Sequence, residues 1–150
     1  MKIQIKHRWT GNVLFETDAE TIGGALDAAI AAKANLTDAN LTDADLKKLL
    51  AVRTILPDGD LIGWKKLKGG VICKLSIPAK AKRVGGLIGR KCRAEYAVVL
   101  EGEGVSNHNG SFKYVKAAEV RPDKFDPNPL LECSHGIHFF ISRQEAEDYN

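Results

Sequence analysis

From residue 61 to residue 141 the sequence alternates short apolar segments with glycine-rich turns, without helical periodicity between them. Strands joined by such short turns pair antiparallel, because a parallel connection needs a crossover of a dozen or more residues. The turn Lys68-Gly69-Gly70 is typical of a β-hairpin. The pattern therefore predicts a mostly antiparallel sheet with strands over 61–67, 71–77, 92–100, 112–115 and 136–141.

The N-terminal part predicts a smaller α+β element. Ile3 and Ile5 alternate with polar residues over 2–6, and 13–15 can return as the second strand of a hairpin. Apolar residues then recur at helical spacing over 21–33, with Thr21 or Asp18 as the N-cap.

Residues 34–48 read ANLTD-ANLTD-ADLKK, a five-residue repeat with Leu36, Leu41 and Leu46 at its centre. Three repeats are too few to bury a core by stacking on one another, so they need cover from the N-terminal helix or from a second subunit. We therefore expect either a partial coil or a continuing helix here, and possible assembly into a homo-oligomer.

The expected fold class is α+β, with two parts separated at the turn that begins at Pro57. Residues 1–56 would hold the hairpin, the helix and the repeat segment, and residues 57–150 a β-rich domain. Its glycine-rich segment 83–90 is expected to be a mobile loop, and the capping-box pattern Ser142 to Glu145 predicts a short C-terminal helix.

Positive charge is concentrated between residues 61 and 94, which contain ten Lys/Arg residues and no Asp or Glu. All 19 acidic residues of the chain and only 12 of its 22 basic ones lie elsewhere. Such a segment attracts phosphate, nucleotides or acidic proteins, and the alternative is a solvated face that serves solubility.

Within this segment an anion-binding site is predicted. Arginines and lysines that flank a glycine loop can grip phosphate, and aromatic rings nearby can stack a base. The candidate ligand-binding residues are Arg83, Arg90, Lys91, Arg93, Trp64, Tyr96, His138 and Tyr149. For Trp64 and Tyr96, ordinary sheet packing is the alternative.

Other chemistry is weakly indicated. The spacing of Cys133, His135 and His138 is not a recognised zinc pattern, so neither a metal nor a cofactor is predicted. No triad or Cys-His signature indicates an enzyme, and catalytic residues stay unassigned.

The three cysteines form no close pair, which favours reduced, buried thiols. The absence of an apolar run long enough to span a bilayer, and of a signal-peptide core, favours the cytoplasm.

The segments GWKK at 63–66, GRKCRAEY at 89–96, GIHFF at 136–140 and EAEDY at 145–149 resemble a domain of unknown function of bacteriophage and prophage proteins. In these proteins the domain typically follows pentapeptide repeats. The resemblance implies a phage accessory protein in the cytoplasm of an infected bacterium. The segment from Gly136, with Ala146 and Tyr149, is also similar to the segment that lines the nicotinamide pocket of ADP-ribosyltransferases, although His138 stands where those enzymes have tyrosine.

Together these observations predict a binding protein that sequesters a nucleotide-derived anion. The anion would be a host immune signal, and its sequestration would serve the phage as a counter-defence. One alternative is an enzyme that cleaves or transfers such a nucleotide. Another is an adaptor that lays its basic face on an acidic protein. Nucleic acid is a less favoured partner because no reader motif is present.

Overall fold

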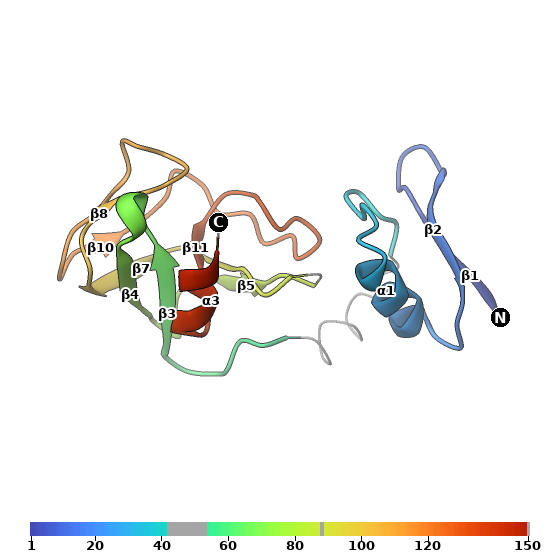
Figure 1. Ribbon diagram of the computed structural model, residues 1–150, viewed down its shortest axis with the longest axis horizontal. Coiled ribbons are helices and arrows are strands. Elements are labelled where there is room, and N and C mark those ends of the chain that lie inside the picture. The colour runs from blue at the N-terminus through green and yellow to red at the C-terminus, as the bar shows by residue number, and fades with distance from the viewer. Residues whose placement is uncertain (42–53, 88, 150) are drawn as a thin grey trace. The chain divides into compact units, whose positions relative to one another are not determined.

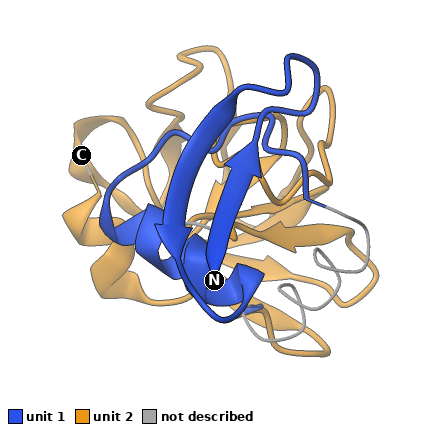
Figure 2. Cartoon of the chain, turned by 90° about the vertical axis from the view of Figure 1, so that its right-hand side faces the viewer, with its two compact units in different colours: residues 1–54 blue, residues 55–150 orange. Residues whose placement is uncertain are grey.

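The computed structural model describes residues 1–41, 54–87 and 89–149. The chain divides into two compact units, residues 1–54 and residues 55–150 (Figure 2). The sequence boundary predicted at Pro57 lies close to this division. Within the described residues, no helix is long and apolar enough to cross a membrane.

The first unit is a β-hairpin with one helix. Strand β1 (Lys2–Lys6) pairs antiparallel with β2 (Val13–Asp18), and α1 (Ile22–Ala31) follows. The predicted N-cap is confirmed, since Thr21 Oγ1 accepts a hydrogen bond from the amide of Gly24 at 3.1 Å. Ile5 and Leu26 are buried in this unit.

The start of the repeat segment belongs to the first unit. Leu36 is buried, and the chain then passes beside β1 through a bridge between Ala39 and His7. A side-chain turn in which Asn35 Oδ1 accepts from the amide of Thr37 opens this passage. Residues 42–48, and with them Leu46, lie outside the described residues. The described repeat residues form a turn against β1 rather than a solenoid coil.

The second unit is built from short antiparallel strands and two short helical segments (Figure 1). One sheet has the order β10-β7-β4-β3, a second has the order β11-β6-β5, and β8 pairs with β9. The elements are β3 (Leu61–Lys66), the 3-10 turn η1 (Lys68–Gly70), β4 (Ile72–Ile77), β5 (Arg83–Gly85), β6 (Cys92–Ala94), β7 (Ala97–Glu101), β8 (Gly104–Val105), β9 (Lys113–Tyr114), β10 (Glu119–Val120), β11 (Ile137–Phe139) and α3 (Arg143–Asp148).

The α+β class and the mostly antiparallel pairing are confirmed. The predicted hairpin is β3-η1-β4, in which Gly69 takes a φ of +80° that only glycine adopts at low cost. A bridge between Trp64 and Phe140 then joins the edge of the first sheet to the end of β11. The two sheets therefore share one core, centred on the fully buried Phe139 and Leu75.

Two sequence expectations are wrong in detail. Residues 92–100 form two strands in different sheets, because the chain bends at Glu95, whose amide donates to Lys82 O. Residues 83–85, expected in a mobile loop, form β5 and pair with β6. Both differences arise from long-range strand pairing, which local glycine content does not predict.

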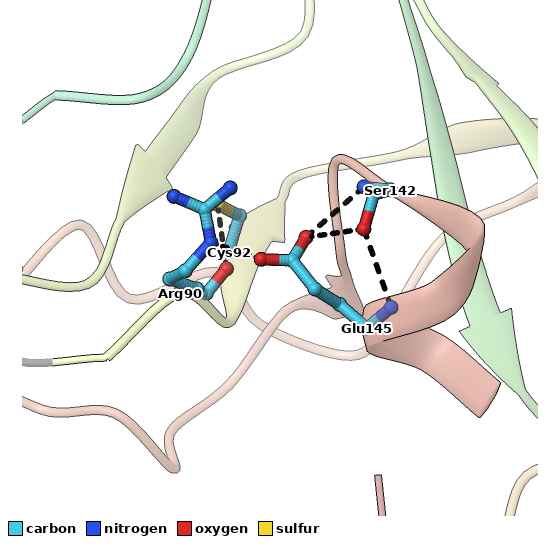
Figure 3. Close-up of polar contacts among 4 residues, drawn as sticks. All are labelled: Arg90, Cys92, Ser142 and Glu145. Atoms are coloured by element: carbon cyan, nitrogen blue, oxygen red, sulfur yellow. Dashed lines mark hydrogen bonds and ion pairs between the residues drawn. The ribbon is translucent and has the colours of Figure 1, made fainter. Parts of the chain in front are cut away.

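The C-terminal helix α3 lies beside β3 (Figure 1). Its predicted capping box is confirmed: Ser142 Oγ accepts from the Glu145 amide, and the Glu145 carboxylate accepts from the Ser142 amide. Glu145 also forms an ion pair with Arg90, so the helix start is joined to the segment before β6 (Figure 3).

Candidate functional site

A cavity of about 730 Å³ opens in the second unit. Its walls come from β3, the residue before β6, the segment from β8 through β9, the segment between β10 and β11 together with β11, and the C-terminus. The lining residues are Lys65, Lys66, Lys91, Ser106, Asn107, His108, Asn109, Phe112, Tyr114, Pro122, Asp123, Cys133, Ser134, His135, Gly136, Ile137, His138, Phe140 and Tyr149.

Lys65 enters this cavity from the inward face of β3. Leu61, Gly63 and Leu67 are all buried, and Lys65 continues the same alternation along the strand. Its Nζ donates to His138 O at 3.3 Å and lies 5.7 Å from the centre of the Tyr114 ring. A lysine in an inward register is uncommon, because burial penalises its charged form.

Lys91 supplies a second ammonium group and is 5% exposed. Its Nζ is 3.0 Å from Cys133 Sγ and 3.0 Å from the Tyr149 hydroxyl, and it also lies near the Tyr149 ring. Burial opposes the charged form, but these two contacts outweigh it and raise the pKa of Lys91. Lys91 is therefore a permanent cation in the cavity wall.

Arg93, although buried, does not face the cavity but holds one of its walls in place. Its guanidinium donates to four main-chain oxygens, those of Asp126, Asn128, Leu131 and Glu132. This segment leads directly into the cavity residues from Cys133 onward. These four hydrogen bonds fix the conformation of the loop before β11.

The remaining walls are largely aromatic and neutral. Phe140 and Tyr149 pack with ring centres 5.2 Å apart, and Phe112 packs edge-on to Tyr114 at 5.3 Å. Burial lowers the pKa of His138 to about 4, and its Nε2 lies 2.6 Å from Ser134 O. At neutral pH His138 is therefore an uncharged wall residue that donates its ring N–H to that carbonyl.

Charge in the cavity is unbalanced. Among the described lining residues, Asp123 is the only carboxylate, and it faces His135, with 3.6 Å between the carboxylate oxygen and Nδ1. The Lys66 ammonium is hydrogen-bonded to the C-terminal segment, since its Nζ donates to Glu147 O and Tyr149 O. Lys65 and Lys91 have no carboxylate partner in the part of the chain that the structure describes.

The structure brings together three of the eight residues predicted from sequence. Lys91, His138 and Tyr149 all line the cavity. The arginines, however, have other partners. Arg83 donates to the main-chain oxygens of Pro57 and Gly59, and Arg90 pairs with Glu145.

The two aromatic candidates outside the cavity are Trp64, in β3, and Tyr96, between β6 and β7. The Lys74 ammonium and the Arg143 guanidinium each lie 5.7 Å from a ring centre of Trp64, and the Arg121 guanidinium lies 4.4 Å from the ring centre of Tyr96. The basic segment therefore does not form one continuous face, because its side chains point to different sides of the strands.

Sequence reasoning missed Lys65, Tyr114 and the wall from Cys133 to His135 as site residues. The signal for Lys65 was present, because a lysine that follows the register of buried residues in a strand has to face the core or a cavity.

Cys133 was expected to be buried but is exposed, whereas Cys73 and Cys92 are buried free thiols as predicted. Burial raises the pKa of each of these two to about 11, so they are packing residues.

Comparisons with curated proteins and with solved structures give no match. One family model matches residues 52–146, which include every cavity-lining residue except Tyr149. The repeat segment 34–48 lies before the matched range. Because the match covers more than half of the chain, this protein belongs to DUF5758, a family of unknown function.

Proposed function

We propose that the second unit binds a nucleotide-derived anion in this cavity and sequesters it. The observation that carries the proposal is the pair formed by Lys65 and Lys91, two lysines without carboxylate partners among the described residues, in a cavity with aromatic walls. Ammonium groups without counter-ions favour a phosphate, and aromatic rings favour a flat heterocycle. The biological setting that we propose is a phage protein that withdraws a host immune signal.

The test is binding of nucleotides by calorimetry, with one variant inside the cavity and one outside it. Lys91→Met keeps an unbranched side chain of nearly the same length but removes its charge, so we expect nucleotide affinity to fall at least about tenfold. Lys80→Met is the matched control, because Lys80 is exposed and lies outside the cavity. Equal affinity of the two variants would contradict the proposed site.

Sequestration is distinguished from catalysis by recovering the ligand. The protein is incubated with each nucleotide, denatured by heat, and the released compound is identified by mass spectrometry. Intact ligand supports sequestration, and altered ligand supports the enzyme alternative. The adaptor alternative has less support, because the basic side chains do not share one surface.

A further inference from the structure

We infer that Lys65 is a nucleophilic amine that forms an imine with a phosphorylated aldehyde or ketone, whose phosphate is held by Lys91. The inference deepens the proposed function and rests on it for the use of the cavity. A sugar phosphate of nucleotide origin with a free carbonyl group belongs to this ligand class.

The position of Lys65 is the first argument. Its side chain follows the buried register of β3 but ends at a cavity large enough for a small molecule. Among the described residues, the Lys65 amine makes one hydrogen bond, from Nζ to His138 O. At 3.3 Å this bond is long, and an amine has further positions that can contact a ligand. The amine therefore ends in the cavity, and no carboxylate among the described residues pairs with it and holds it as ammonium.

The surroundings of Lys65 increase the fraction of its amine that is neutral. Burial lowers the pKa of Lys65 to about 8, with the Cys73 thiol opposing this shift and the Lys91 ammonium adding to it. The other titratable groups that face Lys65 are Tyr114 and His138, which are neutral at pH 7.5. About one in four such amines is unprotonated at pH 7.5, against about one in a thousand for an ordinary lysine.

The two lysines therefore have different roles. Lys91 keeps its charge through Cys133 and Tyr149, and can bind a phosphate. The Lys65 nitrogen lone pair can attack a carbonyl carbon to give a carbinolamine. The amine protons then pass to the carbonyl oxygen, which leaves as water, and a carbon–nitrogen double bond forms. No oxidant or reductant takes part.

The experiment uses the whole unmodified protein and pyridoxal 5′-phosphate as the probe, because it carries an aldehyde, a phosphate and an aromatic ring. Borohydride reduces any imine to a stable amine, and peptide mass spectrometry then gives the labelled fraction of each lysine. We expect Lys65 to be labelled at least about tenfold more than the exposed Lys80 and Lys82 at pH 7.5, since only neutral amines attack. Its labelling should level off above about pH 8, whereas that of the exposed lysines should continue to rise.

Pyridoxal, which lacks the phosphate, should label Lys65 several-fold less, and Lys91→Met should remove this preference for the phosphorylated probe. Labelling of Lys65 no stronger than that of Lys80, or equal labelling by both probes, would overturn the inference. If nucleotides bind but Lys65 is not labelled, the imine inference is overturned and the proposed nucleotide binding stands. A labelled Lys65 without binding of any nucleotide would instead contradict the proposed nucleotide ligand and leave the imine chemistry standing.

Discussion

At the residue scale, the proposed chemistry depends on a difference in protonation between the two lysines in one cavity. Lys65 is surrounded by groups that are neutral or positive, whereas Lys91 contacts two groups that can stabilise its charge. Separating the pKa values of neighbouring groups is a common way to obtain a nucleophile and a binding cation from similar side chains.

Tyr149 has two separable contributions to the site, and each can be removed in turn. Tyr149→Phe loses the hydroxyl that contacts Lys91 but keeps the ring beside Phe140, so nucleotide affinity should fall about threefold to tenfold. Tyr149→Ala also loses the ring and should weaken binding by a further factor of about ten. Calorimetric titration checks both. Identical affinities for the two variants would show that the ring contributes nothing.

At the element scale, β3 is held close to β11 by a glycine. A Cβ added at Gly63 would lie 2.6 Å from a ring carbon of Phe139 and 2.9 Å from Ile77 Cδ1. Gly63→Ala should therefore lower the free energy of unfolding by about 1–3 kcal/mol through overpacking. Gly110→Ala is the control, because no atom lies within 4 Å of the added Cβ. Urea denaturation followed by circular dichroism measures both, and similar midpoints would contradict the packing argument.

The two N-caps offer a comparison between the units. Ser142→Ala and Thr21→Ala each remove a capping acceptor, and each should destabilise its own helix by about 1 kcal/mol. Helix α3 carries the C-terminal segment that Lys66 and Tyr149 hold at the cavity, whereas α1 belongs to the first unit. We therefore expect calorimetry to show weaker nucleotide binding in Ser142→Ala and unchanged binding in Thr21→Ala. Equal losses in both would contradict the assignment of the site to the second unit.

At the scale of the whole molecule, the second unit alone supplies all the residues that line the cavity. Every residue that lines the cavity lies between residues 65 and 149, and the family match begins at residue 52. Among the described residues, most of the groups whose pKa values are shifted by the fold lie in this unit, such as Lys65, Tyr114 and His138, and the first unit has only Lys2 and Glu16. Stability of the protein should therefore respond to pH mainly through this unit.

His138 predicts the direction of one such response. Its pKa is about 4 in the folded protein and near 6.5 when unfolded, so the unfolded state takes up the proton first as the pH falls. Stability is then full above pH 6.5 and decreases toward pH 4, by about 1–2 kcal/mol after allowance for solvent screening. Chemical denaturation at several pH values measures this slope. His138→Gln should flatten it between pH 6.5 and 4.5, and an unchanged slope would contradict this origin.

Local sequence patterns determined much of the architecture. The alternation around the glycine turn at 68–70 predicted the β3–β4 hairpin, and Thr21 and Ser142 predicted where two helices begin. These features follow from the sequence because the interactions that produce them span only a few residues. The concentration of lysine and arginine between residues 61 and 94 likewise identifies the segment that supplies Lys65 and Lys91.

Tertiary structure alone decided which of those cations meet in the cavity. Arg83, Arg90 and Arg93 are as basic in the sequence as Lys91, but strand pairing directs them to main-chain oxygens or to a carboxylate. The cavity itself forms where β3, the segment before β11 and the C-terminus converge. Lys65 contacts His138, 73 residues later in the chain, and Lys66 contacts Glu147, 81 residues later. Local propensity carries no information on such distant contacts, because packing and long-range hydrogen bonds select them only when the whole unit has folded.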